Sequence, residues 1–220
     1  MEMKSLVIAS RVLSTLFRPS YYPTVCFAIV LTFTLLASTS RMSWPLRTQY
    51  FGYGLLIVAI VMFFTILLPY AGVYTYRRLA QLSKIQLRQQ RYRYVPYLIN
   101  ILCYGFCLQF LLRGGLPSNL CCIIVASLVL QICCTVINFW HKVSMHSAAA
   151  AGLVGTLMAY SFIYNFNPLW WLCMALLLWG CVASSRLILR IHNLPQVLIG
   201  SLVGLVSTML SILHASTWIG

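Results

Sequence analysis

The sequence predicts an all-α, polytopic membrane bundle of six to seven transmembrane helices, preceded by an N-terminal interfacial helix. Three observations lead to this class: 61% of the 220 residues are hydrophobic, only 7% are charged, and long apolar runs recur along the chain. Soluble domains carry about 25% charged residues, so this chain cannot cover a water-facing surface. Backbone groups in lipid must be satisfied internally, and the alternating pattern of a β-barrel is absent, so we expect the runs to be helices.

Seven apolar runs approach the roughly 20 helical residues that are needed to cross a hydrocarbon core of about 30 Å. They lie near residues 22–38, 50–73, 96–112, 119–139, 147–165, 168–184 and 196–214. The stretch before Tyr21 is half polar, which is typical of a helix that lies in the membrane interface. We expect no signal peptide, no internal repeat and one membrane domain over residues 1–220.

The acidic residues restrict the chemistry most. Glu2 is the only carboxylate side chain, and there is no aspartate. This composition excludes an aspartyl-phosphate intermediate, a glycosidase with paired carboxylates and a carboxylate cage for magnesium or calcium. Nine cysteines lie in the apolar runs without a CxxC pair, and free cysteine packs as a small hydrophobic residue. The sequence therefore predicts neither a metal site nor a cofactor.

Basic residues are distributed unequally between the two sides of a seven-span topology. Arg41, Arg47 and Arg113 fall on one side, and the other twelve of the 15 Lys and Arg residues fall on the side of the N-terminus. The positive-inside rule then places the N-terminus in the cytoplasm. Three of the four histidines, His141, His146 and His192, lie on the same side.

Three polar connections converge on this membrane face. They are KIQLRQQRYRYVPY (84–97), WHKVSMHSAAAAG (140–152) and SSRLILRIHNLPQ (184–196). Taken singly, each is explained by a solvated basic loop or a polar helix cap. Taken together, they predict a site for an anionic headgroup, because guanidinium groups and a helix N-terminus both bind phosphate oxygens. Nucleic acid is disfavoured as a partner, since lipid holds each connection at both ends.

Two of these connections resemble motifs of the phosphatidic acid phosphatase type-2 superfamily, which includes lipid phosphate phosphatases and vanadium haloperoxidases. The family carries Lys-x6-Arg-Pro, Pro-Ser-Gly-His and Ser-Arg-x5-His-x3-Asp, in this order. This chain has Ser144-Met145-His146 for the second motif and Ser185-Arg186-x5-His192-x3-Gln196 for the third. The resemblance covers about 77–213, and the short connections are similar to those of compact, divergent bacterial members.

The resemblance implies a role for each matching residue. His192 would be the nucleophile that forms a phosphohistidine, and His146 would be the general acid for the leaving oxygen. Arg186 and Ser144 would bind the phosphoryl oxygens. Gln196 stands where the family has an aspartate that orients the nucleophilic ring, and its amide can accept the hydrogen bond without bringing charge.

The first motif departs furthest from the family pattern, because Val95 rather than arginine precedes Pro96. The resemblance assigns its phosphate contact to Arg93, with Arg91 or Arg88 in place of the lysine. A membrane phosphatase for a lipid phosphate or a polyprenyl (pyro)phosphate, in a bacterial inner membrane, is therefore the first hypothesis. A catalytically weak relative that binds anionic lipid headgroups, a transporter or channel, and a structural subunit stay open as alternatives. The sequence does not identify a protein partner.

Overall fold

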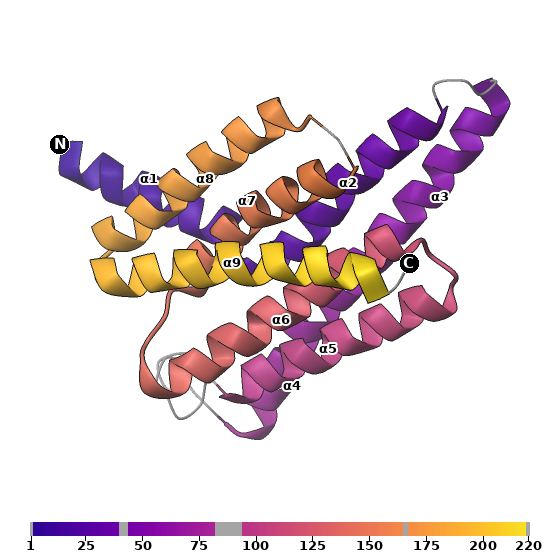
Figure 1. Ribbon diagram of the computed structural model, residues 1–220. Coiled ribbons are helices and arrows are strands. Elements are labelled where there is room, and N and C mark those ends of the chain that lie inside the picture. Colours follow the sequence, from indigo (N-terminus) through magenta and orange to yellow (C-terminus); the bar gives the residue numbers. More distant parts are fainter. Residues whose placement is uncertain (1, 40–43, 82–93, 165–166, 219–220) are drawn as a thin grey trace. The chain divides into compact units, whose positions relative to one another are not determined.

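The computed structural model describes residues 2–39, 44–81, 94–164 and 167–218, and all of their regular secondary structure is helical (Figure 1). The chain forms two compact units. One combines Met1–Tyr22 with Val125–Gly220, and the other is Pro23–Ile124. The predicted all-α class is confirmed.

The helices follow the predicted apolar runs closely. In chain order they are α1 (Glu2–Leu16), η1 (Pro19–Tyr21), α2 (Tyr22–Thr39), α3 (Trp44–Met62), η2 (Phe63–Leu67), α4 (Leu68–Leu79), α5 (Tyr94–Arg113), α6 (Ser118–Trp140), α7 (Met145–Tyr164), α8 (Leu169–Ile188) and α9 (Leu194–Trp218). Over the described residues, six helices are long and apolar enough to cross a membrane: Gly52–Leu79, Tyr94–Arg113, Leu120–Trp140, Met145–Ile163, Leu169–Ile188 and Leu194–Ala215. The run near 22–38 is helical as α2 but is not one of the six.

In the unit formed by Pro23–Ile124, α3, η2 and α4 make one span that contains a π-helical turn. Pro69 follows this turn and has no N–H group to donate to the carbonyl four residues earlier, which favours a wider local turn. The hydroxyl of Thr65 in the turn donates to the carbonyl of Val61 at 2.8 Å and lies 2.8 Å from the Thr24 hydroxyl. α4 then packs against α5.

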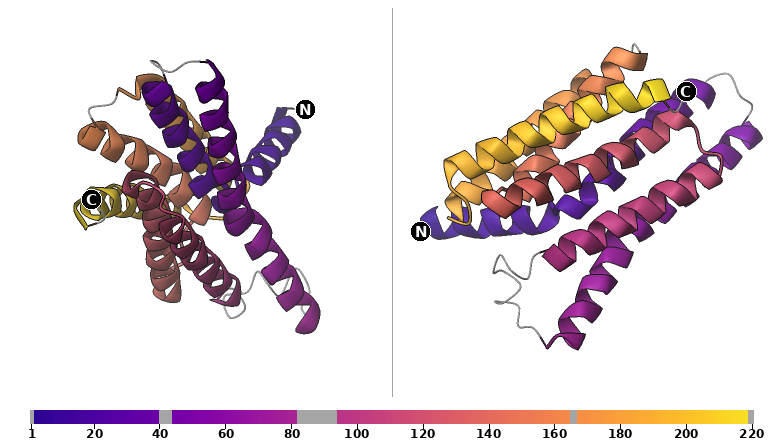
Figure 2. Two further views of the ribbon diagram at one scale, coloured as in Figure 1. Left: turned by 90° about the vertical axis from the view of Figure 1, so that its right-hand side faces the viewer. Right: turned by 60° about the horizontal axis from the view of Figure 1, so that its bottom comes forward.

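The other unit is organised around the close contact between α7 and α9, with α8 beside them (Figure 2). The sequence 147–152 consists of small residues, which can admit a neighbouring helix at close range. They do so: a Cβ atom on Gly204 of α9 would overlap the backbone carbonyl of Ala148 in α7. A Cβ on Gly200 would lie 2.8 Å from the carbonyl oxygen of Ser144. Glycine at these two positions therefore lets the backbone of α9 touch that of α7.

A buried hydroxyl network connects α7, α8 and α9. The Ser201 hydroxyl donates to the carbonyl of Val197 at 2.8 Å, which uses its only proton. Its oxygen accepts from the Trp179 indole N–H at 2.9 Å and lies within hydrogen-bonding distance of the Ser147 hydroxyl. Ser147 is therefore the donor to Ser201, and the three helices are held in one register.

Gly204→Val is expected to destabilise the protein, because a side chain at this position must push α9 away from the α7 backbone. Overpacking of a close contact costs typically about 1–3 kcal/mol. Thermal unfolding of the purified protein in detergent measures the effect. The matched control is Gly105→Val in α5, where a Cβ atom meets nothing within 4 Å. Equal unfolding temperatures for the two variants would contradict this account of the helix contact.

Candidate functional site

The candidate site lies in the unit of Met1–Tyr22 and Val125–Gly220, at the end where α7 begins and α8 ends. Ser144 immediately precedes α7 and is fully buried. Its hydroxyl accepts the backbone N–H of Ser147 at 3.4 Å, the geometry of a helix N-cap. Its own N–H donates to the carbonyl of Gln196 at 3.3 Å. The second motif and the third are thus joined directly through the backbone.

The third motif forms the end of α8, a tight turn and the start of α9. Arg190 adopts a left-handed conformation (φ 51°) just after α8, and this turns the chain toward α9. His192 lies in the turn and is 9% exposed, and Gln196 follows in the first turn of α9. The His192 Nδ1 and Gln196 Oε1 atoms are 3.1 Å apart. The expected contact between these side chains is present.

A second hydrogen bond to Gln196 shows which nitrogen of the His192 ring carries the proton. The backbone N–H of Asn193 donates to the same Oε1 atom of Gln196 at 3.3 Å, so this atom is an acceptor. Nδ1 of a neutral His192 must then carry the proton, and Nε2 carries the lone pair. The ring is therefore held in the tautomer that a histidine nucleophile needs.

Arg186 is buried near the end of α8, with only 7% of its surface exposed. One Nη1 proton is donated to the Ser14 hydroxyl of α1, which lies against α8 (Figure 1). Its Nε atom is buried and has no hydrogen-bond partner. No carboxylate among the side chains that the structure describes pairs with this cation, and an unpaired buried cation costs free energy. An anionic ligand would offset that cost and would use the free donor.

His146 is the second residue of α7 and is partly buried. Its ring lies beside the backbone of Ser14 and within electrostatic range of Arg186, His192 and Arg18. The structure therefore gathers His146, Ser144, Arg186, His192 and Gln196 at one end of the unit.

Three contributors to this cluster were not identified from the sequence. Ser14 binds Arg186, Arg18 adds positive charge near His146, and the Lys142 ammonium donates to the carbonyl of Ile191 at 3.0 Å. The only sequence signal for the first was a pair of serines, Ser10 and Ser14, one helical turn apart in the half-polar stretch before Tyr21. The N-terminal helix is therefore a wall of the site as well as an interfacial segment.

The remaining phosphate-binding candidates from the sequence lie in the connection between α4 and α5. Arg88, Arg91 and Arg93 lie outside the described residues. All nine cysteines are free thiols, six of them buried. Within the described ranges, no group of three His, Cys, Asp or Glu side chains could hold a metal ion.

Comparison with known proteins adds no further assignment. No family model, no curated protein and no solved structure matches the chain. What the site can do must therefore be argued from its own residues. Two histidines, a buried guanidinium and a capped helix N-terminus are suited to bind a phosphate group and to act on it.

Proposed function

We propose that the protein is a membrane phosphatase that releases phosphate from a lipid phosphate or a polyprenyl (pyro)phosphate without a metal ion. The observation that carries the proposal is the 3.1 Å contact between His192 Nδ1 and Gln196 Oε1. It orients a nucleophilic ring in the same polar cluster as the buried Arg186 guanidinium and His146. The motif resemblance supports the same assignment.

In the first step, the Nε2 lone pair of His192 would attack phosphorus and form a P–N bond. The P–O bond to the leaving group would break, and its electron pair would stay on the leaving oxygen. His146 would donate the proton that this oxygen needs. A phosphate bound at Arg186 would bring negative charge beside His146, which favours the imidazolium form that acts as the acid.

In the second step, water would attack the phosphohistidine. His146, now neutral, would take a proton from this water, and the P–N bond would break with its electron pair returning to Nε2. Inorganic phosphate would leave, and both histidines would regain their starting forms. A lipid monophosphate yields an alcohol in this cycle, and a diphosphate yields a monophosphate.

Arg186 and the start of α7 would bind the phosphoryl oxygens in both steps. The planar guanidinium can present two parallel N–H donors to two oxygens. Its Nε atom already lacks a partner, so binding through this donor breaks no existing hydrogen bond. Backbone N–H groups behind the Ser144 cap would add donors for the charge that develops on the phosphoryl group.

Binding of an anionic headgroup without turnover is the second candidate function, and one observation favours it. Gln196 is an amide, so no carboxylate supports the imidazolium that forms when phosphorus is attached. In serine proteases the corresponding change from carboxylate to amide lowers turnover about 10⁴-fold. The Arg186 part of the site is unaffected by this difference, because it uses the charge and the N–H donors of the guanidinium and not the Gln196 amide.

Phosphate release by the purified protein distinguishes the two functions. We expect release from phosphatidate and from a polyprenyl diphosphate, inhibition by vanadate, and a trapped phosphoprotein that is stable to alkali and lost in acid. Binding to vesicles that contain phosphatidate, with no release from either substrate, would favour the binding function.

Gln196→Asp is expected to raise turnover about tenfold, which is about 1.4 kcal/mol off the barrier, if chemistry limits the rate. A carboxylate would stabilise the imidazolium of His192 and raise the basicity of its ring. The matched variant is Gln196→Glu, which keeps the length of the side chain and replaces only the amide. Steady-state rates on one substrate measure both variants. A lower rate in both would mean that the amide binds substrate and does not merely orient the ring.

The charge bias supports placing this site on the cytoplasmic face of the membrane, and the family resemblance supports a bacterial inner membrane. His141→Cys tests the orientation, because residue 141 is exposed in the connection between α6 and α7. We expect a membrane-impermeant thiol reagent to label this variant only after the cells are opened. Wild-type protein, whose nine cysteines lie in helices, is the control. Labelling in intact cells would place the site on the outer face.

A further inference from the structure

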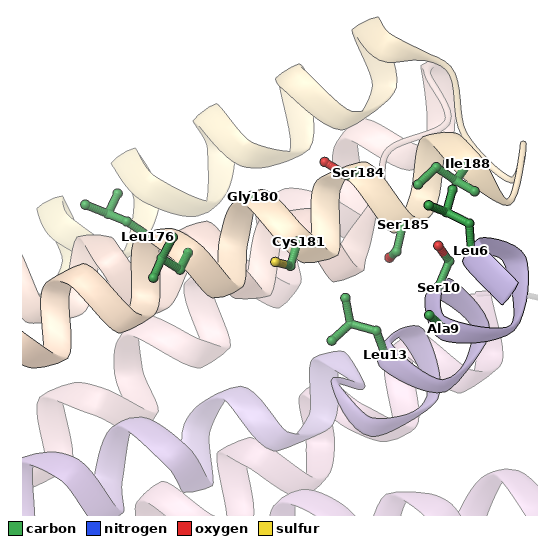
Figure 3. A pocket seen from close by; sticks show the side chains of 11 residues that line it. Leu6, Ala9, Ser10, Leu13, Leu176, Gly180, Cys181, Ser184, Ser185 and Ile188 are labelled. Carbon is green, nitrogen blue, oxygen red and sulfur yellow. The ribbon is translucent and has the colours of Figure 1, made fainter. Parts of the chain in front are cut away.

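An apolar groove of about 660 Å³ runs between α1 and α8, in the same unit as the site. Figure 3 shows Leu6, Ser10 and Leu13 pointing from α1 toward α8, and Ser185 pointing back toward α1. Leucines at positions 176 and 177 line the far end of the groove. Most of the groove is therefore hydrocarbon, and its hydroxyl groups lie toward one end.

The hydroxyl groups of the groove lie on the same two helices as the cation site, although neither Arg186 nor Ser14 lines the groove itself. Ser185 of the groove directly precedes Arg186, whose guanidinium donates to Ser14. Ser10 of the groove lies one helical turn before Ser14, on the same face of α1. The two helices that form the groove thus also hold the buried guanidinium.

The middle of the groove is open. A Cβ atom added to Gly180 would meet nothing within 4 Å, and the neighbouring Cys181 is exposed. From Leu176 to Ser185 the groove follows nine residues of α8, about 14 Å at 1.5 Å per residue. This is nearly half of the roughly 30 Å hydrocarbon core of a bilayer.

We propose that this groove holds the hydrocarbon tail of the lipid whose phosphate binds at Arg186, so that the substrate is a phosphate on a long acyl or prenyl chain. The inference rests on the proposed function for its headgroup and adds the tail subsite. Two complementary features identify the occupant. A buried cation with an unpartnered Nε atom requires an anion, and the adjoining leucines and Gly180 require an apolar chain. A membrane lipid with a terminal phosphate carries both an anionic group and an apolar chain.

Photocrosslinking tests the tail subsite without measuring turnover. The probe is hexadecylphosphonate with a diazirine in the middle of its chain, added to the full-length protein in phosphatidylcholine vesicles. We expect crosslinks on peptides that contain residues 6–13 and 176–185. Unlabelled hexadecylphosphonate should abolish them, and butylphosphonate and hexadecanol should not, because each lacks one half of the recognised structure.

A substitution that fills the groove provides the matched test. Gly180→Phe is expected to lower the crosslinking yield at least tenfold, since the new ring occupies the open space beside Cys181. Met174→Phe is the control, because residue 174 is exposed on the same helix and does not line the groove. Unfolding temperatures close to wild type for both variants would show that the loss comes from the groove.

Four outcomes separate the tail subsite from its alternatives and from the proposed function. Competition by hexadecanol as effective as that by hexadecylphosphonate would show a groove that binds any apolar chain. Crosslinks between two copies of the protein in place of lipid would assign the groove to self-association. Vanadate-sensitive phosphate release without crosslinks in the groove would remove the tail subsite and leave the proposed function intact. Crosslinks with the expected competition but without phosphate release would support the tail subsite and remove only the phosphatase activity.

Discussion

His192→Ala is expected to reduce phosphate release by on the order of 10³-fold or more, as for other enzymes that lose a nucleophile. The ring of His192 is the one that Gln196 holds with its Nε2 lone pair available for attack. Arg186 and Ser144 would remain to bind the phosphate, but no other group would form the covalent bond to phosphorus. Both the steady-state rate and the acid-labile phosphoprotein should be lost together.

His141→Ala is the matched control for this variant. Residue 141 is an exposed histidine just after α6, on the same membrane face and outside the polar cluster. Its turnover should equal that of the wild type. A rate near wild type in His192→Ala would remove His192 from the nucleophile role, and the phosphatase proposal would lose the residue on which it is centred.

His146→Ala is expected to lower turnover about 10²–10⁴-fold on lipid substrates, the usual contribution of a general acid. The size of the loss should depend on the leaving group. A lipid alcohol needs a proton as the P–O bond breaks, whereas an aryl oxygen leaves readily as an anion. We therefore expect a much smaller loss on p-nitrophenyl phosphate.

The ratio of the two losses is the informative measurement. A merely structural role for His146 would lower both rates by the same factor, because both substrates need the same folded site. Rates for the lipid and the aryl substrate, measured on one preparation, separate these explanations. An equal loss on both would exclude His146 as the general acid and leave its contact with the Ser14 backbone as its role.

Sequence reasoning predicted those features that depend on local spacing. Apolar length identified all six spans found among the described residues, since a helix needs about 20 mostly apolar residues to cross a bilayer. The four-residue interval between His192 and Gln196 predicted their contact, which is present at 3.1 Å. The run of small residues after Ser147 predicted a close helix neighbour, and α9 fills that role through Gly200 and Gly204.

Helix ends were predicted less well. The run near 168–184 continues as α8 to Ile188 and takes Arg186 into the helix. The run near 50–73 contains the π-helical turn Phe63–Leu67, and the helix continues beyond residue 73 to Leu79. Hydropathy marks only the apolar part of a span, whereas a helix continues wherever its backbone and polar side chains find partners.

The part of the site that comes from α1 could not be predicted. Ser14 and Arg186 are 172 positions apart, so no periodicity relates them. Their contact depends on how α1 packs against α8, and a single sequence contains no direct signal for such packing. The same limit applied to the groove, whose two walls come from opposite ends of the chain.

The backbone contact between α7 and α9 has a consequence for how the substrate range of such a site could change. His146 is the second residue of α7 and His192 precedes α9, so the spacing of the two histidines depends on a contact between backbones at Gly200 and Gly204 and not on the side chains around the site. α1, in contrast, meets the site through the Ser14 hydroxyl and backbone and through the apolar side chains of the groove. The separation of the two histidines is thus set by backbone packing, whereas the surface that α1 contributes depends mainly on its side chains. Under the proposed function, substitutions along α1 should therefore change which lipid is accepted while the separation of the two histidines stays the same.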